Sequence, residues 1–248
     1  VNGEAMDYLV NKFNEENTDG ITVEAVYQGE YDDTINKLKS AQIGNMGADL
    51  VQIYDIGTRF MIDSGWVIPM QELMDANGYD NSNIVPNIAA YYTIDDQLYS
   101  MPFNTSTPIL YYNKDMFTKA GIDASKDLKS FEDLYTVSKK LVAGGYTTYG
   151  IGFHPDGFYF NAALGREGIM YYDNDNGYKG TIEHCLYTSD STVNSAVKTM
   201  LGVYQKLHAE NLCIAYGSNY QKEIIPQLAD GACAMMMAVV SVTGKVLT

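Results

Sequence analysis

The chain has 248 residues, 46% of them hydrophobic, so it can bury a large core or divide into two lobes of roughly 100–150 residues each. Its 31 acidic and 16 basic side chains give a net charge of -15, which repels nucleic-acid phosphates and anionic membrane surfaces. We therefore expect a globular protein with no nucleic-acid partner.

The cysteines and the apolar runs are both sparse. The chain has three cysteines, Cys185, Cys213 and Cys233, which are too few and too widely spaced for a metal-ligand set or a dense disulfide framework. Two of them could still form one disulfide bond. The longest apolar run, residues 232–240, is about half of the roughly 20 residues that span a bilayer. The chain opens without an export signal, in a pattern typical of the middle of a helix.

The first hundred residues alternate between helical and strand-like patterns. Apolar spacing predicts helices at residues 4–17 and 31–43, and strands at 21–27 and 48–54. A hairpin is expected over residues 91–103, turning at Asp95 and Asp96. Alternating strands and helices indicate an α/β layer with a parallel sheet, which binds ligands at the carboxyl ends of its strands.

From residue 114 onward the chain reads as helices with fewer strands. Ser130 and Asp133 form a predicted capping box for a helix that continues to residue 143. Strands are expected at residues 149–153 and 233–239, a polar loop at 173–180, and further helices at 115–120, 156–164, 192–209 and 224–229.

Three motifs in this order carry a family resemblance. They are YQGEY at residues 27–31, QIYDIGT at 52–58 and PFNTSTPILYYNK at 102–114. Similar segments at residues 13–17, 117–121 and 231–235 extend the likeness over nearly the whole chain. Together they resemble family 1 of the extracellular solute-binding proteins of carbohydrate ABC importers, nearest to the glycerol-3-phosphate-binding branch.

The resemblance implies a two-lobed α/β fold of the type II periplasmic-binding-protein kind, which closes on its ligand like a hinged clamp. We expect the first lobe at residues 1–109, the second at 110–238, and the start of a return crossing at 239–248. Residues 101–113 would be the first crossing between the lobes. Relatives begin with an earlier strand and continue further, so the chain is expected to be a fragment truncated at both ends.

The resemblance also implies an extracytoplasmic binding protein and no enzyme. Its solute would be a small polyol phosphate or a sugar, such as glycerol-3-phosphate, a glycerophosphodiester or an oligosaccharide. The loaded protein, expected to be a monomer, would dock on the permease subunits of an ABC importer. No cofactor and no metal are expected.

Six residues are the ligand-binding candidates. A carboxylate accepts hydrogen bonds from vicinal hydroxyls, a tyrosine offers a ring face and a phenol, and a serine serves hydroxyl or phosphate oxygens. Relatives place a tyrosine, a glutamate and a serine on the ligand at three of these positions, and a tryptophan pair near two others. The candidates are Tyr31, Asp55, Ser106, His154, Phe158 and Ser241.

Other interpretations of these residues stay open. Taken singly, these residue types are more typical of packing for Tyr31, of a turn or an N-cap for Asp55 and of a turn for Ser106. Asp55 and Asp156 could serve as acid and base of a hydrolase acting on a sugar or phosphodiester, and a receptor-like binder is a third reading. Residues 173–177 alternate Asp and Asn as in a calcium loop, but they lack the downstream glutamate that such a loop needs.

Overall fold

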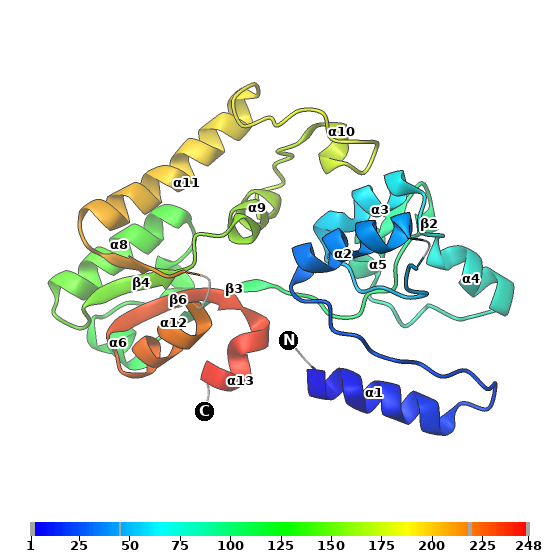
Figure 1. Cartoon of the computed structure of the whole chain (residues 1–248). Coiled ribbons are helices and arrows are strands. Elements are labelled where there is room, and N and C mark those ends of the chain that lie inside the picture. Colours follow the sequence, from blue (N-terminus) through cyan, green and yellow to red (C-terminus); the bar gives the residue numbers. More distant parts are fainter. Residues whose placement is uncertain (1–2, 45, 218–219, 247–248) are drawn as a thin grey trace. The chain divides into compact units, whose positions relative to one another are not determined.

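A computed structural model describes residues 3–44, 46–217 and 220–246 (Figure 1). Contacts between Cα atoms divide the chain into a first part, Val1–Ile68, and a second part, Pro69–Thr248. Each part is described by itself. The lobe boundaries expected at residues 109 and 238 stay predictions, and residues 247–248 of the expected return crossing lie outside the described residues.

The first part consists of short helices joined by extended chain. The predicted helices near its start are confirmed, and α2 begins where the Glu30 amide donates to the Asp33 carboxylate at 3.2 Å. A carboxylate at this position satisfies a backbone amide that a helix start leaves without an intrahelical partner. The elements are α1 (Gly3–Glu16), α2 (Tyr31–Ile43), η1 (Asp55–Gly57) and α3 (Thr58–Ser64).

The strands predicted at residues 21–27 and 48–54 are wrong, because the structure assigns no strand to either segment. A strand needs a neighbour that takes up its backbone hydrogen bonds, and an alternating sequence does not supply one. In the first segment the Asn14 side chain substitutes locally: it accepts from the Val23 amide and donates to the Val23 carbonyl, both at 2.8 Å.

The second part opens with two helices and the predicted hairpin. Asp95 and Asp96 have φ angles of 51° and 60°, as a tight type I′ turn requires at both central positions. The hairpin is therefore confirmed. Its elements are α4 (Met70–Asn77), α5 (Pro86–Tyr91), β1 (Thr93–Ile94) and β2 (Gln97–Leu98).

A four-stranded sheet with the order β3-β6-β4-β5 forms the centre of the second part. β3 is antiparallel to β6, whereas β4 is parallel to both β5 and β6. The strands predicted at residues 149–153 and 233–239 are confirmed. The four strands are β3 (Pro108–Tyr112), β4 (Tyr149–Phe153), β5 (Cys213–Ala215) and β6 (Cys233–Val239).

Helices cover both faces of this sheet. The predicted capping box of α8 is confirmed, since the Asp133 amide donates to the Ser130 hydroxyl and the Ser130 amide donates back to the Asp133 carboxylate. Within the polar loop expected at residues 173–180 there is a single turn, α10. The elements are α6 (Lys114–Lys119), α7 (Ala124–Asp127), α8 (Phe131–Ala143), α9 (Gly157–Arg166), α10 (Asp173–Asn176), α11 (Ser191–Ala209), α12 (Tyr220–Ala229), η2 (Val240–Val242) and α13 (Thr243–Val246).

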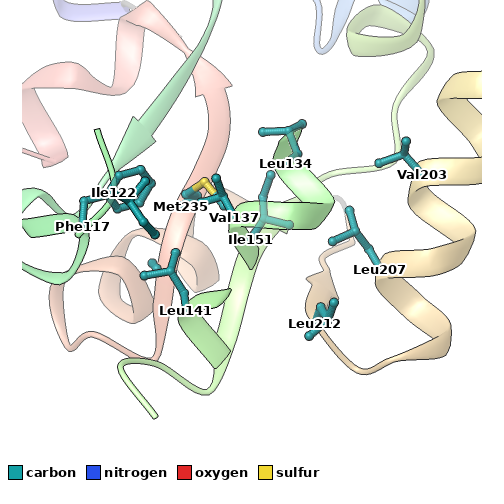
Figure 2. Close-up of a cluster of buried hydrophobic side chains, with 11 residues drawn as sticks. Phe117, Ile122, Leu134, Val137, Leu141, Ile151, Val203, Leu207, Leu212 and Met235 are labelled. Atoms are coloured by element: carbon teal, nitrogen blue, oxygen red, sulfur yellow. The ribbon is translucent and has the colours of Figure 1, made fainter. Parts of the chain in front are cut away.

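Two of the buried clusters of the second part lie on the two sides of β6. Met235 belongs to one buried cluster with residues of α8 and α11, and in Figure 2 it lies beside Val137 of α8, whereas Met236 belongs to a second cluster with Ile224 of α12. Adjacent strand residues point to opposite faces, so the methionine run serves both layers. The Figure 2 cluster also contains Leu141 and Leu207, whose side chains are fully buried.

Close contact between α8 and β4 depends on one glycine. A Cβ added at Gly150 would lie 2.3 Å from the Cβ and 2.4 Å from the Cα of Ser138, so only glycine fits without displacing the helix. The three cysteines, which might have formed a disulfide bond, are free thiols. Among the described helices, none combines the length and apolar character that crossing a membrane requires.

Candidate functional site

Two of the six candidates, Tyr31 and Asp55, lie in the first part and begin helices. Tyr31 is the first residue of α2, and Asp55 is the first residue of η1. Tyr31 is 43% exposed, and its ring stacks on the Tyr54 ring, with centroids 5.1 Å apart and planes 6° from parallel. Tyr31 therefore has one ring face covered by a second aromatic ring, and Asp55 is the next residue along the chain from that second ring.

Tyr54 is held at its hydroxyl as well as at its ring. The hydroxyl donates to the Asp32 carboxylate at 2.7 Å. Burial, the Asp32 bond and the nearby charges of Asp32 and Asp55 together raise the pKa of Tyr54 to about 12, because each disfavours the phenolate. Sequence reasoning missed Tyr54 and Asp32. The only signal was their position beside motif residues, since stacking between residues 31 and 54 depends on tertiary packing.

Each basic side chain of the first part has a partner within that part, two of them an acidic side chain. Its basic residues are Lys12, Lys37, Lys39 and Arg59. Lys12 pairs with Glu16 at 3.3 Å and Arg59 pairs with Asp63, while the Lys37 ammonium donates to the Gln28 carbonyl at 2.6 Å and Lys39 lies 4.5 Å from the Phe60 ring centre. Because each of these cations has such a partner, Tyr31 and Asp55 lie in an acidic setting, with Asp32 next to Tyr31 in the chain.

The other four candidates lie in the second part, at one edge of its sheet. Because β3 runs antiparallel to β6, the start of β3 lies beside the end of β6, where Pro108 pairs with Val239 and the Val240 amide donates to the Thr107 carbonyl at 3.0 Å. Because β4 runs parallel to β6, its carboxyl end lies at that same edge. Residues just before β3 and just after β4 and β6 are therefore neighbours in the fold.

The sheet thus gathers candidates that are far apart in the sequence. Ser106 lies two residues before β3 and is exposed, and Ser241 lies in η2 directly after β6 and is also exposed. His154 follows the last residue of β4, and Phe158 lies in the first turn of α9 with 38% of its surface exposed. The carboxyl edge of a parallel sheet is where α/β proteins bind ligands.

His154 has a fixed ring. Its Nδ1 lies 3.0 Å from the Tyr216 carbonyl, and its Nε2 lies 3.6 Å from the Asp156 carboxylate. Tyr216 continues from β5, where its amide donates to the Phe153 carbonyl at 3.0 Å. Sequence reasoning missed Tyr216, because the three-residue strand before it gives almost no periodic signal. Asp156 accepts from the Phe158 amide at 2.7 Å, so its observed role is to cap α9.

One group of side chains in the described part of the chain could offer three metal ligands. Ligand atoms of Asp173, Glu183 and His184 all lie within 4.8 Å of one another. The Asp173 carboxylate already accepts from the Glu183 amide at 3.0 Å. Asp175, which lies in the segment that alternates Asp and Asn, pairs with Lys179 at 3.2 Å. These contacts explain the local geometry without a cation.

Comparison with known proteins gives one family. The family described as bacterial extracellular solute-binding protein matches residues 8–244. The sn-glycerol-3-phosphate-binding periplasmic protein UgpB of Brucella abortus is 35% identical over 153 residues, which cover 60% of this chain and 35% of that protein. UgpB of Salmonella paratyphi A is 38% identical over 148 residues, covering 58% of this chain and 33% of that protein. The matched stretches thus span about a third of each relative.

Solved structures agree on the fold. UgpB from Mycobacterium tuberculosis, in complex with glycerophosphocholine, superimposes with a TM-score of 0.75 at 20% identity, over 98% of this chain and 58% of that one. The sugar-binding protein MalE from Xanthomonas citri gives a TM-score of 0.74 at 17% identity, over 98% and 59%. The predicted α/β fold of the type II periplasmic-binding-protein kind is therefore confirmed.

Proposed function

The chain belongs to the bacterial extracellular solute-binding protein family, and on this premise we propose that the whole protein captures a small polyol phosphate or sugar and performs no chemistry on it. Capture takes place outside the cytoplasm, and the loaded protein, a monomer, delivers its solute to the permease subunits of an ABC importer. The single observation that carries the proposal is the gathering of Ser106, His154, Phe158 and Ser241 at one sheet edge.

The two sets of candidates differ in the chemical groups that they suit. Tyr31 offers an exposed ring and Asp55 a carboxylate, in a part of the chain where each lysine and arginine has another partner. Carboxylates accept hydrogen bonds from neutral hydroxyls and repel phosphate. We assign the hydroxyl-bearing end to these residues. Ser106 and Ser241, as hydroxyl donors, suit a phosphate or further hydroxyls.

Thermal-shift and calorimetric titration of the full-length protein test the proposal. The probes are sn-glycerol-3-phosphate, glycerophosphocholine and maltose. A ligand at about 100 times its Kd stabilises by about 2.7 kcal/mol, which raises the Tm of the longer full-length protein by a few degrees. Asp55→Asn should weaken that stabilisation, whereas Asp19→Asn, an exposed aspartate in the same part, should leave it unchanged.

Two outcomes would overturn the proposal. If no probe stabilises the wild-type protein, solute capture of this class is wrong. If mass spectrometry recovers a probe hydrolysed, and Asp55→Asn abolishes the turnover, the protein is an enzyme. Light scattering of the purified protein checks the monomer, and cell fractionation checks the location.

A further inference from the structure

Tyr54 contacts the ring of Tyr31 and also the start of α2, the helix that Tyr31 begins. Its ring lies parallel to that of Tyr31 at 5.1 Å between centroids, which is an offset stack, the arrangement that aromatic pairs prefer. Its hydroxyl donates to Asp32, the residue after Tyr31 on α2. Tyr54 therefore fixes one face of Tyr31 while its own hydroxyl is held by the same helix.

The same contacts fix the start of η1, where Asp55 lies. The Gly57 amide donates to the Tyr54 carbonyl at 3.0 Å and closes the turn around Asp55. Gly57 is buried, and a Cβ there would lie 2.7 Å from the Ile53 side chain and 3.1 Å from the Ile35 side chain of α2. The absence of a side chain at Gly57 thus lets this turn lie directly against α2.

An exposed aromatic ring that turns freely must be ordered when a ligand stacks on it, and this ordering weakens binding. With 43% of its surface exposed, Tyr31 is open to such motion except where Tyr54 covers it. A ring already held on one face presents its other face without that loss. A fixed backbone at η1 likewise reduces the ordering that the carboxylate of Asp55 undergoes when a solute binds.

We propose that Tyr54 is a positioning residue, which holds the open face of Tyr31 and the carboxylate of Asp55 in one arrangement for the solute. This role rests on the proposed function and extends it, since Tyr54 acts through its neighbours and touches no solute. The hydroxyl bond to Asp32 keeps the Tyr54 ring in the stacked orientation.

The test compares two substitutions of Tyr54 in the full-length protein, with calorimetric Kd for the probe that binds the wild type and Tm without ligand as readouts. Tyr54→Phe keeps the stack and loses the bond to Asp32, so Kd should rise about threefold. Tyr54→Leu loses both, so Kd should rise about tenfold or more. Tyr27→Leu is the matched control, because Tyr27 lies in the same part and is 77% exposed.

The readouts separate positioning from a merely structural role. A positioning role predicts that affinity falls from the wild type to Tyr54→Phe and falls further in Tyr54→Leu. It also predicts that the ligand-free Tm of Tyr54→Phe equals that of Tyr27→Leu within about 2 °C. The proposal is overturned if Tyr54→Leu binds as tightly as Tyr27→Leu, or if affinity falls only in proportion to Tm. A wild type that binds no probe instead overturns the proposed function itself.

Discussion

The two parts of the chain differ in what they bury. The second part packs both faces of a four-stranded sheet, with Met235 and Met236 fully buried between helices. In the first part α1 buries no side chain, and Leu50 and Ile43 are 82% and 89% exposed. Helices formed in both parts because their signals are local, whereas the buried clusters of the described residues all lie in the second part, two of them on the paired strands.

The largest expected effect is at the contact between α8 and β4. Gly150→Val would place a branched side chain against the Ser138 backbone. A Cβ alone would already lie 2.4 Å from the Ser138 Cα, so the second part should lose its cooperative unfolding. Gly202→Ala is the control, because a Cβ there meets nothing within 4 Å and alanine favours the helix by about 1 kcal/mol. Urea unfolding followed by circular dichroism measures both. A stable Gly150→Val protein would show that this contact is loose.

A pair of leucine truncations compares the two parts directly. Leu141→Ala removes a side chain that is fully buried in the second part and should cost about 3–5 kcal/mol. Leu38→Ala acts on a side chain that is 7% exposed in the first part, beside fewer buried neighbours, and should cost about 1–2 kcal/mol.

The single tryptophan, Trp66, lies in the first part, so its fluorescence reports that part, whereas circular dichroism reports the whole chain. Leu38→Ala should shift the fluorescence transition and Leu141→Ala should not. If both variants shift it equally, the two parts unfold as one unit and the contrast between them is wrong.

The smallest effects come from two hydroxyls of the same region. Ser130→Ala removes the N-cap of α8 and should cost about 1 kcal/mol. Ser138→Ala removes a fully buried hydroxyl for which the described residues offer no hydrogen-bond partner, so the change should lie within about 0.5 kcal/mol or stabilise. The urea unfolding midpoints of the two variants and the wild type, measured side by side, give both changes in stability. A costly Ser138→Ala would mean that this hydroxyl has a partner, such as a buried water.

Local signals made part of the fold predictable. The capping box at Ser130 and the apolar run of β6 each lie within one short segment, and both were predicted correctly. The strands expected at residues 21–27 and 48–54 failed because pairing is not encoded in the segment that alternates. β5 was missed because three residues are too few for a period to show.

In the candidate site, only residues that lie within the recognised motifs could be predicted from the sequence. Tyr31 and Asp55 could be named from their motifs, and their roles as solute ligands stay predictions. The Tyr31–Tyr54 stack and the placement of His154 by Tyr216 join residues 23 and 62 positions apart. Such contacts arise from the order and direction of elements, which no single segment specifies.

The free thiols have a practical consequence. Cys233 is fully buried and burial raises its pKa to about 12, and burial likewise raises the pKa of Cys213 above its usual value. Of the three thiols, that of Cys185 is the exposed one, and Cys213 is half-buried. Alkylating dyes react with accessible thiolates, so a maleimide fluorophore should attach at Cys185 in the native protein without any cysteine being removed. The described part of the chain thus offers one accessible thiol at which an optical reporter can be attached.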